Sequence, residues 1–124
     1  MNKENINTRK INLQEIKELV INVFQTQGCD ILNANALANT IVSAEQDGSS
    51  SHGLFRVPGY VASLQSGKVN GKSSPKVQHQ TPVILKCNAD NGFASYSHKI
   101  ALPMLVDAAK INGIAALSIT GCYH

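Results

Sequence analysis

Apolar residues recur with helical spacing in the first part of the chain. In the segment NLQEIKELVINVFQTQG, residues 12–28, they fall at three- and four-residue steps and so share one helical face. These residues are Leu13, Ile16, Leu19, Val20, Val23 and Phe24. Asn12 and Glu15 have the spacing of a capping box, and Gly28 is suited to end the helix in a left-handed conformation. The pattern therefore predicts a helix whose two ends are encoded locally.

Two further helices are predicted before the composition of the chain changes. Asn33 is placed to begin a helix over residues 34–46, and the alanines there predict close packing against the first helix. Its inward-facing residues are expected to be Leu37, Ile41 and Ala44. A short helix is predicted over residues 57–67, because Pro58 is tolerated in a first turn and Gly67 is suited to end it.

A loop rich in Gly, Ser and Lys, residues 68–76, separates these helices from a region of mixed pattern. The β-leaning runs over residues 76–80 and 82–88 predict a hairpin or two neighbouring strands. A helix is predicted over residues 95–113, where Pro103 should produce a kink or delay the start. One face of that helix is expected to carry Ile100, Met104, Ala108 and Ile111.

The last element is a nearly all-apolar run, IAALSIT, over residues 114–120. Such a run is typical of a strand that is buried on both faces of a sheet. It is followed by GCYH, where the sequence stops, so the strand would keep an uncovered edge, which proteins usually avoid. We therefore expect this sequence to be a fragment of a longer protein.

Composition narrows the functional classes. The 124 residues carry a net charge of +3, but the lysines are scattered and form no basic stripe of the kind that follows nucleic-acid phosphates. A basic helical binding module is thus a weak alternative, and we expect no nucleic-acid partner. No apolar run is long enough for a membrane span or a signal core, which predicts a cytoplasmic protein without a membrane partner. The three cysteines, Cys29, Cys87 and Cys122, are widely spaced, as expected for reduced thiols.

Two kinds of cofactor site have little support. Cys122 and His124 could form half of a metal site with His79 or His98, but the spacing matches no standard pattern, so we expect no metal. No G-x-G-x-x-G turn follows a predicted strand, so the chain does not indicate a Rossmann-type dinucleotide site.

The segment DGSSSHGLFRVPGY, residues 47–60, concentrates hydrogen-bonding side chains beside core-like residues. If a helix begins near Gly53, then His52, Arg56 and Tyr60 project toward the same side, and Ser51 adds a donor. Such a group suits a small carboxylate, which an arginine grips with two parallel hydrogen bonds. The competing interpretation is helix capping with solvated side chains. A serine hydrolase is disfavoured, because adjacent residues cannot meet as nucleophile and base and there is no G-x-S-x-G elbow.

Several motifs together resemble a known enzyme family. AEQDGSSSHGLFRVPGYVASLQSGKVNGK, ADNGFA, AAKINGIAALSI and the closing GCYH resemble the N-terminal part of malate/L-lactate dehydrogenase-like oxidoreductases. Within that family the chain looks most like the Δ1-piperideine-2-carboxylate/Δ1-pyrroline-2-carboxylate reductases. The resemblance implies a non-Rossmann enzyme, usually a homodimer, that uses NADPH or NADH on a small carboxylate substrate.

The resemblance also implies roles for individual residues. Ser51 and His52 would line the active site as catalytic residues, Arg56 would hold the substrate carboxylate, and Tyr60 is a weaker candidate for substrate binding. His124 would stand near the reacting carbon as a proton donor or acceptor. Family members commonly have Asn or Ser two residues before this histidine, where this chain has a cysteine. The cofactor-binding residues are expected mostly outside this sequence.

These observations predict an α+β fold with two parts. Residues 1–72 form an N-terminal helical subdomain that carries the S-H-G-x-x-R motif, and residues 73–124 begin a mixed α/β subdomain. The predicted function is that of the N-terminal part of an NAD(P)H-dependent reductase of cyclic imino acids, and the fragment alone is expected to be inactive. The alternatives are a 2-hydroxyacid dehydrogenase of the same family and a non-catalytic truncated remnant.

Overall fold

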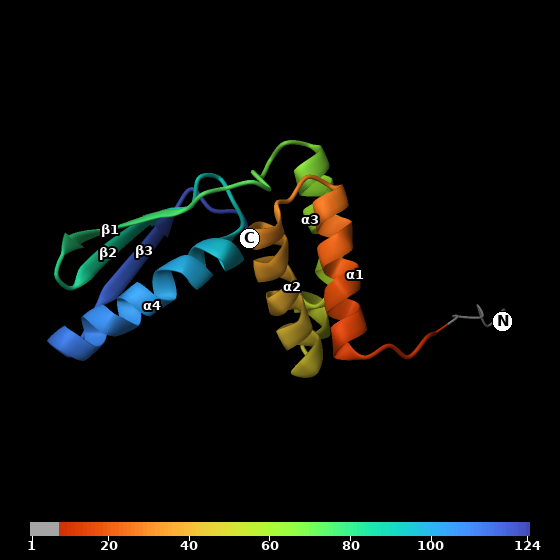
Figure 1. Cartoon of the computed structure of the whole chain (residues 1–124), viewed down its shortest axis with the longest axis horizontal. Helices are drawn as coiled ribbons and strands as arrows, with labels where there is room; N and C mark the ends of the chain where they lie inside the picture. The colour runs from red at the N-terminus through yellow and green to blue at the C-terminus, as the bar shows by residue number, and fades with distance from the viewer. Residues whose placement is uncertain (1–7) are drawn as a thin grey trace.

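The computed structural model describes residues 8–124, and its elements follow the predicted order closely (Figure 1). They are α1 (Leu13–Thr26), α2 (Ile31–Gln46), α3 (Val57–Gln65), β1 (Lys76–Thr81), β2 (Ile84–Asn88), α4 (Ala94–Asn112) and β3 (Ala116–Thr120). The fold is α+β, as expected. Helices α1 to α3 lie together in one half, and the sheet with α4 forms the other (Figure 1).

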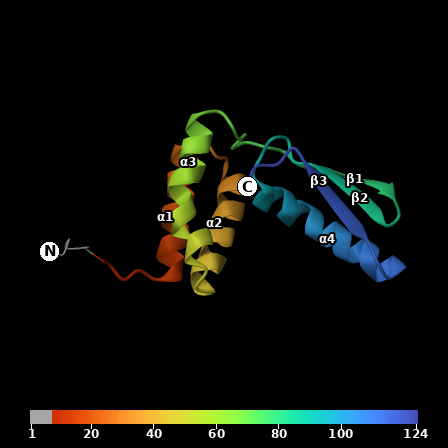
Figure 2. The same cartoon turned by 180° about the vertical axis from the view of Figure 1, so that it is seen from behind.

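The first half is held together by an apolar core between α1 and α2. Ile16, Val20 and Phe24 of α1 are buried in one cluster with Leu37 and Ile41 of α2. Burying such side chains stabilises a fold by about 1.5–3 kcal/mol each relative to leaving them in water. The view from behind shows α3 packed across this pair (Figure 2).

The start of α1 is as predicted, whereas the start of α2 is not. At α1 the Asn12 side chain accepts a hydrogen bond from the Glu15 amide at 2.8 Å. At α2 the N-cap is Asp30, whose carboxylate accepts from the Asn33 amide at 2.9 Å. The prediction that Asn33 begins the helix is therefore wrong. Asn33 is fully buried within the first turn, where its side chain amide donates to Asp30 and to the Ser73 carbonyl.

The loop between the halves is packed against them. The Ser73 hydroxyl donates to the Asn33 side chain at 2.9 Å, and the Asp30 amide donates to the Gly71 carbonyl at 3.0 Å. The Asn70 amide donates to the Asn91 carbonyl at 2.8 Å, which links this loop to the turn after β2. These bonds fix the orientation of the sheet relative to the helices.

The sheet has the order β1-β2-β3, with an antiparallel hairpin followed by a parallel crossover through α4. On β2, Leu85 and Cys87 are buried while Lys86 and Asn88 are exposed, so α4 covers only one face of the sheet. The expectation that residues 114–120 form a strand buried on both faces is wrong. The side chains of β3 alternate between half-buried and exposed, because no described element covers the second face.

Helix α4 also presents a different face from the predicted one. Its buried residues are Tyr96, Ser97, Ala101 and Ala108. Ile100 and Ile111 are 39% and 82% exposed, so only part of the expected face packs inward. Three of these four buried side chains are small. Pro103 lies inside the helix, which is not delayed in its start.

The described elements include no helix that is both long and apolar enough to cross a bilayer.

Candidate active site

The segment that carries the S-H-G-x-x-R motif forms two short 3-10 turns, Ser50–His52 and Leu54–Arg56, before α3 begins. A continuous helix from Gly53, the condition for His52 to share a side with Arg56 and Tyr60, is therefore not formed, whereas α3 matches the helix predicted over residues 57–67. Gly53 is buried against Glu45 of α2, whose carboxylate accepts a hydrogen bond from the Leu54 amide at 2.8 Å. A Cβ atom at position 53 would lie 2.6 Å from Cδ of Glu45, so a larger residue would require the Glu45 side chain to move. This contact separates the two turns and fixes the segment on α2.

Arg56 ends the second turn and is held by an aromatic ring. Its guanidinium carbon lies 5.3 Å from the centroid of the Tyr60 ring, one helical turn further along. A cation at this distance is attracted by the negative face of the ring. The contact restrains the half-buried side chain and leaves the guanidinium N–H groups as hydrogen-bond donors. Arg56 and Tyr60 thus form a preorganised unit that is suited to an anion.

A row of aromatic rings connects this unit to the other end of the chain. Phe24 lies 6.3 Å from Tyr60, Tyr60 lies 5.3 Å from Phe93, and Phe93 lies 5.9 Å from Tyr123, all between ring centroids. The last two pairs are edge-to-face, a favourable geometry for aromatic rings. The row therefore joins α1, α3, the start of α4 and the segment after β3.

Hydrogen bonds fix the same segment after β3. The Tyr123 amide donates to the Gly92 carbonyl at 2.8 Å, and the Tyr123 carbonyl accepts from the Ala94 amide at 2.9 Å. The Tyr123 hydroxyl is hydrogen-bonded to the Ser63 hydroxyl of α3. Both cartoon views place the C-terminal end at the junction of the two halves (Figures 1 and 2). His124, the next residue, is thereby brought to the helical half.

Arg56, Tyr60 and His124 line one pocket of about 320 Å³. Phe55, Gly59 and Tyr123 complete its lining. The pocket thus combines a permanent cation, an imidazole and the rings of three aromatic residues. Such a set can bind a small carboxylate and exchange a proton with it. The volume is at the lower end of the range for small-molecule sites.

Ser51 and His52 do not line that pocket. The Ser51 hydroxyl lies 2.9 Å from Nδ1 of His52 in a hydrogen bond, and both side chains are exposed. Ser51 lines a neighbouring shallow pocket with Ser50 and Phe55. The structure therefore brings three of the five expected site residues together and leaves the Ser51–His52 pair on the other side of Phe55.

Three lining residues, Phe55, Gly59 and Tyr123, were not identified as site residues from the sequence. Tyr123 was part of the quoted GCYH ending, and its position directly before His124 was the available signal. Phe55 lies between Leu54 and Arg56 and was interpreted only as a core-like residue. Its 78% exposure could not be read from residue type, because phenylalanine is usually buried.

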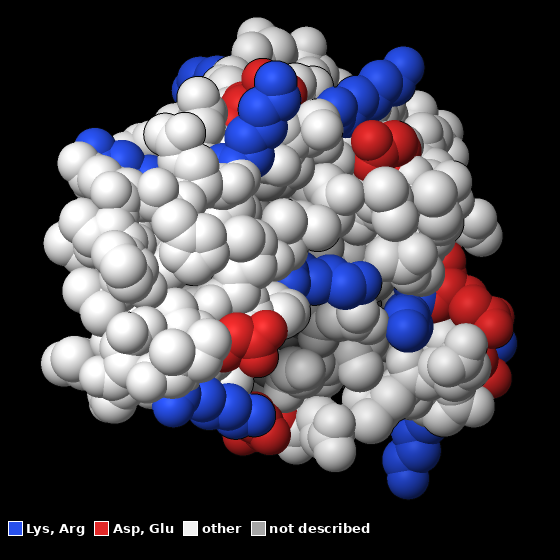
Figure 3. Space-filling view, turned by 60° about the vertical axis from the view of Figure 1, so that its left-hand side comes forward, with Lys and Arg blue, Asp and Glu red and all other residues white. Residues whose placement is uncertain are grey.

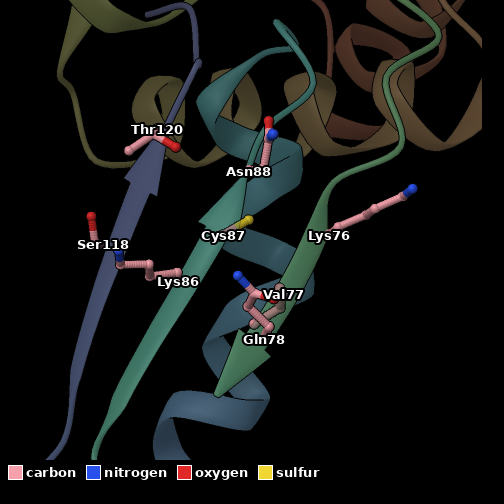
Figure 4. Close-up of a pocket in the computed structure, with 8 residues that line it drawn as sticks. All are labelled: Lys76, Val77, Gln78, Lys86, Cys87, Asn88, Ser118 and Thr120. Carbon is pink, nitrogen blue, oxygen red and sulfur yellow. The ribbon is translucent and has the colours of Figure 1, made fainter. Parts of the chain in front are cut away.

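A larger cavity lies elsewhere, on the sheet face opposite α4 (Figure 4). It has about 770 Å³ and is lined by Lys76, Val77, Gln78, Lys86, Cys87, Asn88, Ser118 and Thr120. In Figure 4 the labelled side chains come from all three strands, while α4 runs behind them. These eight residues include no histidine and no carboxylate, the side chains that most often transfer protons in active sites. We therefore place the candidate site at the smaller pocket.

The three thiols are free but differ in their surroundings. Burial, together with the nearby Asp30 carboxylate, raises the pKa of the Cys29 thiol to about 11. Burial also raises the pKa of the Cys87 thiol. Cys122 is half-buried, and its sulfur lies 3.6 Å from Nε2 of His124. Within residues 8–124 no third His, Cys, Asp or Glu joins such a pair to form a metal-binding group.

Charge is mixed over the surface. On the face shown in Figure 3, lysines and arginines are scattered among acidic residues and do not form a continuous basic stripe. This face therefore gives no support to a module that binds nucleic-acid phosphates.

Comparison with known proteins decides the family. The family model described as malate/L-lactate dehydrogenase matches residues 11–124. The chain belongs to this family. A Delta(1)-pyrroline-2-carboxylate/Delta(1)-piperideine-2-carboxylate reductase of Pseudomonas syringae pv. tomato is 38% identical over 94% of this chain and 34% of its own length. A Delta(1)-pyrroline-2-carboxylate reductase of Ancylobacter novellus is 40% identical over 93% of this chain and 34% of its own length. The resemblance expected from the motifs is confirmed.

Solved structures show the same fold. Sulfolactate dehydrogenase from Methanocaldococcus jannaschii has a TM-score of 0.84 at 26% identity and matches 92% of this chain and 33% of its own length. Malate dehydrogenase from Entamoeba histolytica has a TM-score of 0.86 at 24% identity over 95% of this chain and 33% of its own, and shows the fold alone. This member of the family spans about a third of the length of the curated relatives it matches.

Proposed function

We propose that this chain is the N-terminal part of an NAD(P)H-dependent reductase of cyclic imino acids, and that it supplies the groups that hold the carboxylate and deliver a proton. The observation that carries the proposal is the pocket shared by Arg56, Tyr60 and His124. The names of the relatives from Pseudomonas syringae and Ancylobacter novellus support the substrate class, since both include a five-membered cyclic imino acid. By its resemblance the whole enzyme acts as a cytoplasmic homodimer.

In this proposal Arg56 binds the substrate carboxylate. A guanidinium forms two parallel hydrogen bonds with a carboxylate, which fixes the position and plane of the acid as well as its charge. The Tyr60 ring restrains the guanidinium before the ligand arrives, so less conformational entropy is lost on binding. The carbon that carries the carboxylate is then held at a fixed distance from His124.

His124 is the proposed proton donor. Reduction of a C=N bond adds hydride to the carbon and a proton to the nitrogen, and an imidazolium is suited to give that proton near neutral pH. The nearby Cys122 sulfur, 3.6 Å from Nε2, is positioned to orient the ring. Ser51 and His52 remain proposed catalytic residues, as a hydrogen-bonded pair that would reach the ligand from the far side of Phe55.

The candidate pocket does not fit a nicotinamide dinucleotide. A pocket of about 320 Å³ accommodates a small acid, not a dinucleotide, and no G-x-G-x-x-G turn in the sequence opens a helix to hold a diphosphate. We therefore place the residues that would bind NADPH or NADH mainly outside residues 8–124. The 124-residue chain is accordingly expected to bind the acid without reducing it.

A 2-hydroxyacid dehydrogenase is the second candidate. It is favoured by the structural likeness to sulfolactate dehydrogenase at 26% identity. The same arginine and histidine would serve that reaction, since a 2-hydroxyacid also carries its reacting carbon next to a carboxylate. The two candidates differ in what the pocket must accept beyond the carboxylate.

The test is carboxylate binding to the 124-residue chain. Pyrrole-2-carboxylate is a stable probe with a planar nitrogen ring and the carboxylate on the carbon next to nitrogen, and its binding can be followed by NMR titration of backbone amides. Arg56→Lys keeps the charge and loses one of the two parallel hydrogen bonds, so the dissociation constant should rise about tenfold. Arg9→Lys, an exposed arginine near the start of α1, is the matched control and should change nothing. Equal affinity of the Arg56→Lys variant and the unmodified chain would refute the proposed carboxylate site.

A further inference from the structure

We infer that Phe55 selects the ring of the substrate, so that the site prefers a monocarboxylic acid with a flat apolar body over an acid with a second charged group. This inference rests on the proposed function and adds a specificity-determining residue to it. Phe55 is 78% exposed and lines both the pocket of Arg56 and His124 and the neighbouring pocket of Ser51. It thus stands between the two groups of proposed site residues.

The exposure of Phe55 follows from the turn that carries it. A 3-10 turn has three residues per turn, so side chains three positions apart point the same way. Leu54 and Val57, three apart, are both packed against the core of the helical half. Phe55 is therefore directed away from the core. The contact of Gly53 with Glu45 fixes this turn in place, so the phenyl ring is held outward by the backbone.

An exposed phenyl ring is costly where the chain could bury it. Full burial of a phenylalanine side chain stabilises a fold by about 1.5–3 kcal/mol, and the position forgoes most of that. A flat apolar ligand would recover part of this stabilisation by covering the ring. The pocket of Arg56 and His124 supplies the polar contacts for such a ligand. Arg56 is suited to bind its carboxylate, and His124 is suited to bind a polar ring atom.

The charges of the pocket favour one carboxylate. Arg56 is the single permanent cation among the six lining residues, and Phe55, Tyr60 and Tyr123 supply apolar surface. A second carboxylate on the ligand would lie against these rings and lose hydration, and the lining holds no second arginine or lysine to pair with it. A cyclic imino acid has one carboxylate, which matches Arg56, and a ring that is hydrocarbon apart from its nitrogen, which matches the aromatic side chains. A dicarboxylic hydroxy acid has a carboxylate for Arg56 but no ring to cover the aromatic side chains.

The experiment compares probes with and without a ring on the 124-residue chain. Pyrrole-2-carboxylate carries the ring, acetate carries only the carboxylate, and succinate carries two carboxylates. Phe55→Ala should weaken pyrrole-2-carboxylate binding about three- to tenfold, the range expected for a lost aromatic contact, and leave acetate unchanged. Phe55→Tyr, which keeps the aromatic ring, should bind pyrrole-2-carboxylate as tightly as the unmodified chain. Ile114→Ala, at a position that is 75% exposed and outside the pocket, is the control and should have no effect.

Three results would overturn the inference. Phe55→Ala could leave pyrrole-2-carboxylate binding unchanged, it could weaken acetate equally, or succinate could bind the unmodified chain as tightly as pyrrole-2-carboxylate. The competing explanation is that a second copy of the chain covers Phe55, and light scattering tests it. If Phe55→Ala abolishes a dimer and leaves pyrrole-2-carboxylate binding unchanged, Phe55 belongs to an interface between copies. A different result would refute the proposed function, namely that Arg56→Lys leaves the binding of both pyrrole-2-carboxylate and acetate unaltered.

Discussion

Replacing Gly53 by alanine tests whether the contact with Glu45 organises the segment that carries the site. The new Cβ atom would overlap the end of the Glu45 side chain, lying 2.6 Å from Cδ and 2.9 Å from Cγ. Because that side chain is flexible, it can move aside, but it then loses the hydrogen bond that it accepts from the Leu54 amide at 2.8 Å. The cost of the substitution is therefore the cost of that bond.

The magnitude follows from two opposing contributions. A hydrogen bond to a charged group contributes about 1.5–3 kcal/mol to stability. Alanine in place of glycine restricts the unfolded chain and returns about 0.4–1 kcal/mol. The free energy of unfolding should thus fall by about 1–2 kcal/mol in Gly53→Ala. In a Glu45→Ala background the overlap and the bond are both gone, so the same change should become neutral or slightly stabilising.

Urea unfolding followed by circular dichroism of the four variants in this cycle measures the coupling between positions 45 and 53. We expect a coupling free energy of about 1.5–3 kcal/mol. Gly59→Ala is the control, because no atom lies within 4 Å of a Cβ at that helical position, and it should stabilise the chain. Additive effects of Gly53→Ala and Glu45→Ala would show that the two residues do not constrain each other.

Two further predictions concern buried groups. Iodoacetamide near pH 8 should modify Cys122 first, and Cys29 and Cys87 only in urea, because burial keeps the latter two thiols protonated. Mass spectrometry of the labelled peptides measures the order of modification. Rapid labelling of all three thiols in the native chain would contradict this prediction. Asn33→Ala should lower the free energy of unfolding by about 2–4 kcal/mol in urea titrations, because it leaves buried partners without hydrogen bonds. The control is Asn39→Ala, at an exposed position of the same helix, which should change the free energy of unfolding little. An equal loss of stability at both positions would refute the role of the buried amide.

The sequence predicts those elements whose signals are local. The capping of α1 by Asn12, the turn after β2 and the end of α4 at Gly113 depend on residues within a few positions of each other. The start of α2 was mispredicted because Asp30 and Asn33 are both good N-cap residues. The choice between them depends on Ser73, which is 40 residues away and needs the Asn33 side chain in the interior.

The candidate site was predictable only in part for the same reason. The spacing of Arg56 and Tyr60 by four residues places them on one side of the chain entrance, and the structure brings them together. A continuous helix would also have placed His52 there, but the buried contact of Gly53 interrupts it, and Glu45 is eight residues away from the glycine. Only the family resemblance could predict that His124 lies in the same pocket as Arg56, since nothing in the segment GCYH indicates which residues lie near it.

The presence of Arg56 and His124 in one pocket shows how the two halves depend on each other. The group suited to the carboxylate enters with the helices, and the group suited to the proton arrives after the last strand, 68 positions later in the sequence. Their distance is therefore set by whatever joins the halves, which is the row from Tyr60 through Phe93 to Tyr123 and the Tyr123 hydrogen bond to α3. Proton transfer to a bound acid requires atoms within hydrogen-bond reach, so a small displacement across this row would separate binding from chemistry. The aromatic row is thus as much a part of the proposed site as the residues that would touch the ligand.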